Sequence, residues 1–198
     1  MACLKFFYGT MGSGKSTELL KTCDIYERKG IKTAIIKPII DDRDGRQEGW
    51  GIIQSRLVNI SKPAYYFKNI VQEVTNNIEF DMLFVDEAQF LHHEDVQELV
   101  NYVDKYHIDV YCYGLKTNVN GNLFLGAREL LVYADECIEL KNLCQYKKCD
   151  KPANFHLRYI DGKVDVSKNP ICIEKGNVTY ASLCRKHWLE TINQNGKE

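Results

Sequence analysis

The sequence lacks a long hydrophobic run, an excess of one charge and a leader-like N-terminus. No stretch approaches the roughly 20 apolar residues that a membrane-spanning helix needs, so we expect no membrane partner. The 26 Lys and Arg nearly balance 27 Asp and Glu, so charge does not indicate a nucleic-acid partner. The start, "MACLKFFYGT", has neither the basic residues nor the apolar length of a signal peptide. These absences predict a cytoplasmic protein.

Cysteine, by contrast, is plentiful, with 8 residues in the chain. Four of them are scattered through apolar segments, where small thiols commonly pack in cores: Cys3, Cys23, Cys112 and Cys137. The other four fall in the last third: Cys144, Cys149, Cys172 and Cys184. In a cytoplasmic protein, this clustering indicates metal binding rather than disulfides.

Hydrophobic periodicity predicts strands alternating with helices over the first three quarters of the chain. This order is typical of an α/β fold, here a P-loop NTPase (RecA-like) parallel sheet with helices on both faces. The expected strands are 4–8, 32–37, 81–87 and 109–115, and the expected helices are 15–29, 93–106 and one within 64–78. The charged, glycine-bearing segment 39–56 is predicted to be a loop. The pattern changes to hairpins after Leu143, which predicts a domain of residues 1–143 and a small β-rich subdomain of residues 144–198.

Residues 9–16, "GTMGSGKS", match G-x-x-x-x-G-K-[ST] in full, after a predicted strand and before a predicted helix. Gly12 and Gly14 let backbone N–H groups turn toward a phosphate, and the helix N-terminus adds partial positive charge. Lys15 can reach the outer phosphates and the Ser16 hydroxyl can bind Mg²⁺. The alternative is an accidental glycine-rich turn. We expect ATP to bind to Gly9, Thr10, Met11, Gly12, Ser13, Gly14, Lys15 and Ser16.

Two adjacent acids, Asp86 and Glu87, follow the apolar run "MLFV". P-loop proteins place a carboxylate at the end of another core strand to hold the magnesium shell, and Asp86 fits that role together with Ser16. Glu87 is then the candidate base: it would orient water in an ATPase, or take a proton from the acceptor hydroxyl in a kinase. The alternative is that the two acids merely begin a polar loop.

Two short-spaced pairs of soft ligands, C-x4-C and C-x2-H, lie near the C-terminus. Paired knuckles of this kind make tetrahedral structural Zn²⁺ sites with no open coordination position. The predicted ligands are Cys144, Cys149, Cys184 and His187. Cys172 is an alternative to His187, although it has no partner knuckle. His156 alternates like a strand residue and is expected to be a surface or packing histidine.

The phosphate loop, "DEAQF" (86–90), "YGLKT" (113–117) and "YASLCRKHW" (180–188) occur together in this order. The combination resembles the type II (cellular, cytosolic) thymidine kinase family over nearly the whole chain. The resemblance implies transfer of the γ-phosphoryl group of ATP to the 5′-hydroxyl of thymidine, with Mg²⁺ accompanying ATP, and a homotetramer. It makes Glu87 the proton acceptor. It also extends the expected ATP site to Asp86, Glu87, Ala88 and Gln89.

The same resemblance implies that the C-terminal subdomain carries a lasso-like loop closing over the nucleoside. A neutral base suits an apolar slot with a few fixed polar groups. The implied thymidine contacts are Met11, Arg43, Phe90, Leu115, Phe124, Ile171, Ile173 and Tyr180. Val119 stands where many members carry phenylalanine and Lys175 where glycine is common, so deoxyuridine is a candidate second substrate.

Two other functions compete with a nucleoside kinase on the residues alone. A nucleic-acid-binding ATPase with a zinc ribbon would also combine a phosphate loop with zinc knuckles, although the charge is near neutral and no basic stripe is present. A nucleotide-binding regulator without turnover would need no catalytic base. Replacing Glu87 by Gln separates a kinase from such a regulator.

Overall fold

The structure is a computed structural model that describes residues 1–38, 50–55, 59–67, 80–165 and 177–195. The statements below concern these residues. Arg43, Lys175, Ile171, Ile173 and Cys172, which carry some of the expectations above, lie outside them.

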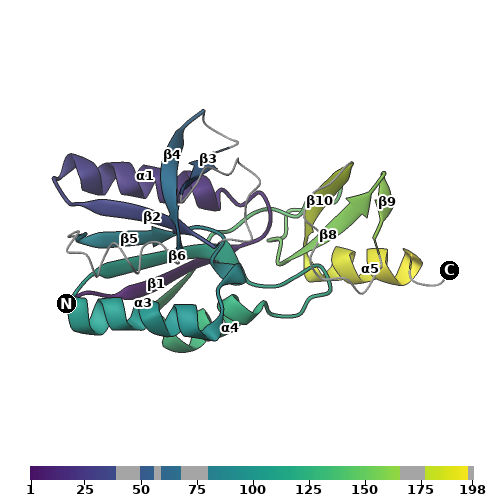
Figure 1. The fold of residues 1–198 in the computed structure, drawn as a ribbon. Coiled ribbons are helices and arrows are strands. Elements are labelled where there is room, and N and C mark those ends of the chain that lie inside the picture. The colour runs from purple at the N-terminus through teal and green to yellow at the C-terminus, as the bar shows by residue number, and fades with distance from the viewer. Residues whose placement is uncertain (39–49, 56–58, 68–79, 166–176, 196–198) are drawn as a thin grey trace.

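A central sheet with the strand order β3-β4-β2-β5-β6-β1-β7 forms the larger part of the structure (Figure 1). Every neighbouring pair is parallel except β3 and β4, which are antiparallel. The predicted parallel α/β fold is therefore confirmed. The strands are β1 (Leu4–Gly9), β2 (Thr33–Lys37), β3 (Trp50–Gln54), β4 (Ser61–Tyr66), β5 (Met82–Val85), β6 (Asp109–Leu115) and β7 (Glu136–Glu139).

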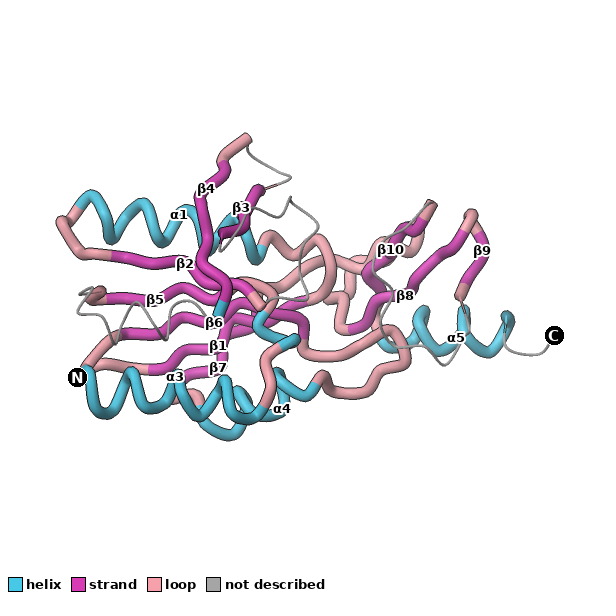
Figure 2. The backbone as a smooth tube through the Cα atoms, viewed as in Figure 1, coloured by secondary structure: helices cyan, strands magenta, loops and turns pink. Residues whose placement is uncertain are grey.

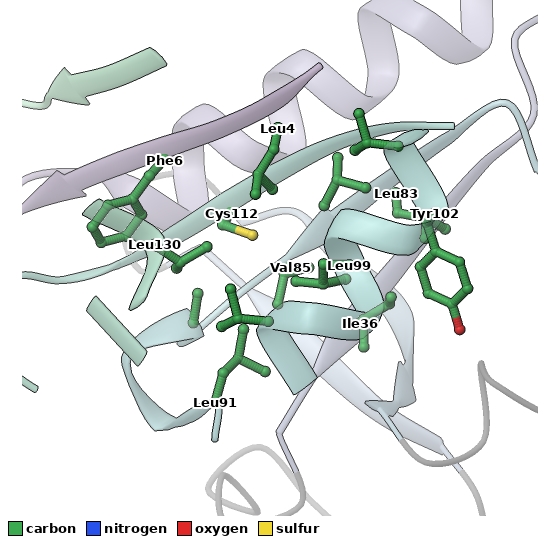
Figure 3. Close-up of a cluster of buried hydrophobic side chains, with 14 of the residues drawn as sticks. Leu4, Phe6, Ile36, Leu83, Val85, Leu91, Leu99, Tyr102, Cys112 and Leu130 are labelled. Carbon is green, nitrogen blue, oxygen red and sulfur yellow. The ribbon is translucent and has the colours of Figure 1, made fainter. Parts of the chain in front are cut away.

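Helices cover both faces of this sheet: α1 (Lys15–Arg28) on one, α3 (His93–Tyr106) and α4 (Leu125–Tyr133) on the other (Figure 1). The alternation of side chains along each strand supplies the two interfaces. Leu83 and Val85 of β5 belong to the core under α3 and α4, where Figure 3 shows them near Leu99. Met82 and Phe84 belong to the core under α1. Because both faces are covered, β5 is buried throughout, as its unbroken apolar run predicts.

A second, three-stranded antiparallel sheet lies beyond one end of the central strands (Figure 2). Its order is β10-β8-β9, from β8 (Phe155–Ile160), β9 (Lys163–Val164) and β10 (Val178–Leu183), and α5 (Arg185–Asn195) follows. Leu157 and Leu183 form a small core with Cys144 and Cys184. An apolar core this small contributes little folding stability, so a bound metal or a partner surface would add a large share of it.

In the central sheet, one sequence expectation is wrong and one strand was not predicted. Residues 50–54, predicted to be loop, form the edge strand β3, because Gly51 and Ile53 face inward and Ile52 and Gln54 outward. Flanking charges concealed this short alternation. Residues 136–139, for which no strand was predicted, form the exposed edge strand β7 beside β1. A helix was expected within residues 64–78. Residues 64–66 belong to β4, and residues 68–78 lie outside the described part of the chain.

Candidate active site and metal centre

The phosphate loop joins β1 to α1 at the carboxyl end of the central sheet. Gly12 and Gly14 have φ of 72° and 81°, in the left-handed region that glycine enters without strain. The Lys15 ammonium donates to the Thr10 carbonyl across the loop at 2.8 Å. The loop therefore has the compact shape that the motif predicts, with the first turn of α1 directly behind it.

Asp86 follows β5 and meets the phosphate loop, as the sequence predicts for two strands that end at one edge of a parallel sheet. The Ser16 hydroxyl donates to Asp86 Oδ2 at 3.2 Å, although 70 residues separate them. Asp86 is 7% exposed, and its backbone N–H donates to the Ile36 carbonyl at 2.9 Å. A hydroxyl and a carboxylate are the hard oxygen ligands that Mg²⁺ prefers, so this pair fits the predicted magnesium site.

Glu87 has an unusual backbone conformation, with φ of 51° and ψ of 36°. A non-glycine residue in this region costs roughly 1 kcal/mol, and such strain concentrates at functional sites. Glu87 stands at the start of the short 3-10 helix η1 (Ala88–Phe90). The left-handed turn sends the chain away from β5 immediately after Asp86, so the two acids project from different positions of one sharp bend.

Gln89 holds the Glu87 side chain. Its Nε2 donates to Glu87 Oε2, and its Oε1 accepts the Leu115 N–H at 2.9 Å. The Leu115 donor fixes which end of the amide is the oxygen, so the amide NH₂ must face Glu87. Gln89 is only 2% exposed. Gln89 was expected among the ATP contacts, and in this structure its amide hydrogen-bonds Glu87 and Leu115 of β6.

Two glycines that sequence reasoning missed allow η1 to sit this close to its neighbours. A Cβ on Gly126 of α4 would lie 2.4 Å from the Ala88 carbonyl oxygen. A Cβ on Gly114 of β6 would lie 2.8 Å from Gln89 Oε1. A glycine inside a strand pattern often marks close backbone approach, so Gly114 carried a usable signal.

Several residues expected to contact the nucleoside base come together near η1. The Phe90 and Phe124 rings pack edge to face, with centroids 5.8 Å apart. Leu115 is 7% exposed and is joined to η1 through Gln89. These side chains come from three separate elements and offer apolar surface next to the acid pair.

Tyr180 belongs to the small sheet, and Met11 lies where the phosphate loop contacts that sheet. Tyr180 on β10 packs edge to face against His156 of β8, with ring centroids 6.2 Å apart. Met11 is linked to β10 because its carbonyl accepts a hydrogen bond from Ser182. The remaining expected contacts, Arg43, Ile171 and Ile173, lie outside the described residues.

His156 is a core residue, so only the packing half of its predicted role is correct. It is 3% exposed, and its Nδ1 has no hydrogen-bond partner among the described residues. Burial, followed by the nearby positive charges of Lys15 and Arg158, lowers the pKa of His156 to about 4. The ring is therefore neutral at physiological pH. It borders a small pocket between the phosphate loop and the small sheet, lined also by Gly9, Thr10, Thr117 and Asn154 among others.

The four predicted metal ligands meet at the base of the small sheet. The ligand atoms of Cys144, Cys149, Cys184 and His187 all lie within 4.8 Å of one another, a group that could hold a metal ion. The Cys144 and Cys184 sulfurs each lie 3.4 Å from His187 Nδ1. Tetrahedral zinc, with Zn–S of about 2.3 Å and Zn–N of about 2.0–2.1 Å, separates S and N ligands by about 3.6 Å, so the spacing fits.

The environment of this cluster also favours metal-binding chemistry. Burial raises the pKa of the Cys144 thiol, but hydrogen bonds from the Cys184 and Tyr146 backbone and from His187 outweigh it and lower the pKa to about 7. A thiol that ionises this readily binds metal at neutral pH. The Tyr146 ring stacks on His187 at 3.9 Å and restricts its orientation.

Within the described parts of the chain, no helix is both long and apolar enough to cross a membrane.

A protein-family model described as thymidine kinase matches residues 2–188. The chain belongs to the thymidine kinase family. The family predicted from the three motifs and the zinc knuckles is thus confirmed.

Curated relatives of this chain match it over nearly its whole length. A thymidine kinase of Shewanella oneidensis is 39% identical over 199 residues, covering 97% of this chain and 99% of that protein. The thymidine kinase of Enterobacteria phage T4 is also 39% identical, over 207 residues, covering 99% and 100%. Among solved structures, a DNA replication initiation factor matches with a TM-score of 0.41 and 13% identity, covering 70% of this chain and 40% of that chain. That similarity is too low to support an argument.

Proposed function

We propose that this protein is an ATP-dependent thymidine kinase, which transfers the γ-phosphoryl group of ATP to the 5′-hydroxyl of thymidine. The product, thymidine monophosphate, would enter pyrimidine deoxynucleotide salvage for DNA synthesis. The observation that carries the proposal is the contact of Ser16 with Asp86, which brings the phosphate loop to the acid pair. Membership of the thymidine kinase family supports the same reaction.

The phosphate donor would occupy residues 9–16, with its outer phosphates near Lys15. Ser16 and Asp86 would hold Mg²⁺, which neutralises charge on the β- and γ-phosphate oxygens when it is bound. Lys15 contacts the Thr10 carbonyl in this structure, so its ammonium already lies across the loop. Because phosphoryl transfer needs mainly positioning and charge neutralisation, these groups supply most of the donor side.

Glu87 would take the proton from the 5′-hydroxyl as the phosphoryl group is transferred. A general base must be held in a fixed direction, because it acts only within hydrogen-bond reach of its proton. The left-handed backbone of Glu87 and the Gln89 amide together supply that direction. We therefore assign Gln89 to the orientation of Glu87, in addition to the ATP contact expected from the sequence for Ala88 and Gln89.

The thymine base would lie against the apolar group made by Phe90, Phe124 and Leu115, with Met11 and Tyr180 nearby. Packing of the Phe90 and Phe124 rings supports such a slot. Arg43, Ile171 and Ile173 stay predicted contacts from the family resemblance. Since Val119 is smaller than the phenylalanine common in the family, deoxyuridine stays a candidate second substrate.

The Cys144, Cys149, Cys184 and His187 cluster would hold one structural Zn²⁺. Four protein ligands fill a tetrahedral shell and leave no position for a reacting water. The separate cores of the two sheets support a division into a nucleotide-binding domain, residues 1–143, and a zinc subdomain, residues 144–198. A homotetramer in the cytoplasm is the assembly and location implied by the resemblance.

A nucleoside panel tests the reaction. Purified protein with ATP and Mg²⁺ should convert thymidine to its monophosphate, measured by chromatography of the products. Glu87→Gln should retain ATP binding, while turnover falls on the order of 10²-fold or more because the base is lost. Glu94→Gln, at an exposed position of α3, is the matched control and should keep full turnover.

Three outcomes would contradict the proposal. The first is the absence of any nucleoside monophosphate. The second is ATP hydrolysis that single-stranded DNA stimulates without nucleoside phosphorylation, which would favour the nucleic-acid-binding ATPase. The third is undiminished turnover in Glu87→Gln.

A further inference from the structure

One carbonyl group of the phosphate loop is held by the small sheet and its connection. The Met11 carbonyl accepts a hydrogen bond from the Ser182 hydroxyl at 2.6 Å and a weaker one from Asn142 Nδ2 at 3.3 Å. Ser182 lies 171 residues away in the sequence, on β10, and Asn142 lies 131 residues away, after β7. Two segments outside the nucleotide-binding motif thus converge on one of its peptide groups.

Both donors are themselves fixed in place. Ser182 is 1% exposed, its N–H donates to Gln145 Oε1 at 2.8 Å, and its carbonyl accepts the Gln145 N–H at 2.9 Å. Asn142 Oδ1 accepts the Leu143 N–H at 2.9 Å, which directs the amide NH₂ toward Met11. The Asn142 carbonyl also accepts the Ala153 N–H at 2.8 Å. These bonds fix the Ser182 backbone, and the Asn142 amide cannot turn away from Met11 without losing its bond to Leu143.

Holding the Met11 carbonyl also sets the direction of the next N–H group. The described residues contain no cis peptide bond, and in a trans peptide the C=O of one residue and the N–H of the next point in opposite directions. The Gly12 N–H therefore points away from Ser182 and Asn142. With its φ of 72°, Gly12 could otherwise adopt several orientations, because glycine is the least restricted residue.

We propose that Ser182 and Asn142 are positioning residues of the phosphate loop, which aim the Gly12 N–H at the phosphates of ATP by holding the Met11 carbonyl. The inference rests on the proposed use of this loop for ATP. It assigns the small sheet a part in binding the phosphate donor, beyond the nucleoside closure expected of that subdomain.

The candidate metal cluster lies next to Ser182 and Asn142 in the sequence. Asn142 stands two residues before Cys144, and Ser182 stands two residues before Cys184. The metal ligands of the two knuckles therefore anchor both donor segments close to where they contact Met11. Metal bound to the cluster would hold the two segments together, so removal of the metal should weaken ATP binding as well as loosen the small sheet.

The test is direct measurement of nucleotide affinity in Ser182→Ala. Calorimetric titration would use the nonhydrolysable analogue adenylyl imidodiphosphate with Mg²⁺, and thymidine in a separate titration. Loss of the hydroxyl should weaken binding of the analogue roughly threefold to tenfold, since one hydrogen bond that preorganises the loop is gone. Thymidine affinity and kcat at saturating ATP should change by less than about twofold. Ser61→Ala, exposed at the start of β4, is the matched control and should change neither affinity.

Asn142→Ala provides a second, independent variant, which decides the matter if Ser182→Ala fails to fold. It should show the same selective loss with a smaller factor, because its bond to Met11 is longer. Unchanged affinity for the analogue in the variants that fold would overturn the inference. Equal losses of analogue and thymidine affinity would also overturn it, since they would report general damage. If wild-type protein binds the analogue but phosphorylates no nucleoside, the proposed function fails. The analogue affinities of the two variants then still decide this inference.

Discussion

Replacing Gln89 by Glu converts the amide donor that faces Glu87 into a carboxylate and leaves the rest of the side chain almost the same size. The Leu115 N–H keeps an acceptor, because a carboxylate oxygen takes the place of Oε1. Glu87 loses its donor and gains a like charge at hydrogen-bond distance. The substitution thus disrupts the contact that orients the proposed base in two ways, by removing its donor and by adding a negative charge.

The size of the effect follows from that contact. A hydrogen bond to a charged group contributes about 1.5–3 kcal/mol. Because this bond helps to hold Glu87 in its working direction, turnover should fall about tenfold to a hundredfold, since roughly 1.4 kcal/mol corresponds to a factor of ten. The KM for ATP should change by less than about twofold, because the phosphate loop is not altered.

Steady-state kinetics with varied ATP and thymidine measure this split. Gln89→Met is the informative companion, because it removes the donor and also leaves the buried Leu115 N–H without an acceptor. That variant should lose about 1–3 kcal/mol of unfolding free energy, a fall in Tm on the order of 5 °C, in addition to turnover. Gln194→Glu, exposed on α5, is the matched control for the change of charge.

A double-mutant cycle would refute the reasoning most directly. If Gln89 acts through Glu87, then Gln89→Glu should have little further effect on the residual turnover of Glu87→Gln. The same fold loss in both backgrounds would mean that Gln89 acts independently of Glu87. Full turnover in Gln89→Glu alone would equally refute an orienting role.

Two further predictions concern the small sheet. The pKa of His156 is lowered to about 4 in the folded state from about 6.5 unfolded, so its contribution to stability is complete above pH 6.5 and is lost as pH falls through 4. Chemical denaturation at several pH values should show a loss of up to about 3 kcal/mol over this range, and His156→Phe should remove most of it; an unchanged slope would contradict the assignment. Metal analysis should find about one zinc per chain, lost in Cys184→Ala and kept in Cys137→Ala, whose thiol is exposed on β7; retention of zinc by the first variant would exclude the four-ligand site.

Much of the fold could be predicted from local patterns. The apolar run of β5 and the helix-period spacing of residues 93–106 are strong signals, because burial on both faces or on one stripe imposes them. The phosphate loop was predictable because its glycines and Lys15 occupy fixed positions in a short motif. Short edge strands were harder to predict. Flanking charges conceal the short alternation of residues 50–54, and residues 136–139 have little buried surface to impose a pattern, so β3 and β7 were missed.

The site residues divide in the same way. Asp86 and Glu87 could be predicted because they are acids that follow a buried strand. The candidate metal ligands could be predicted from their spacing. Gly126, Ser182 and Asn142 are different, because each acts by contact with a segment far away in the sequence. No spacing within the sequence encodes such a contact, since it depends on how α4 and the small sheet pack against the acid bend and the phosphate loop.

The sequence by itself indicated the α/β class, the phosphate-binding motif, the identity of the proposed base and the candidate metal ligands, because each depends on residue type and short spacing. Only the tertiary structure decided how these parts are aimed: the Gln89 amide at Glu87, and the Ser182 hydroxyl and Asn142 amide at the Met11 carbonyl. Hydrogen bonds have direction and short reach, so their partners are fixed only when the packed elements bring distant segments within about 3 Å.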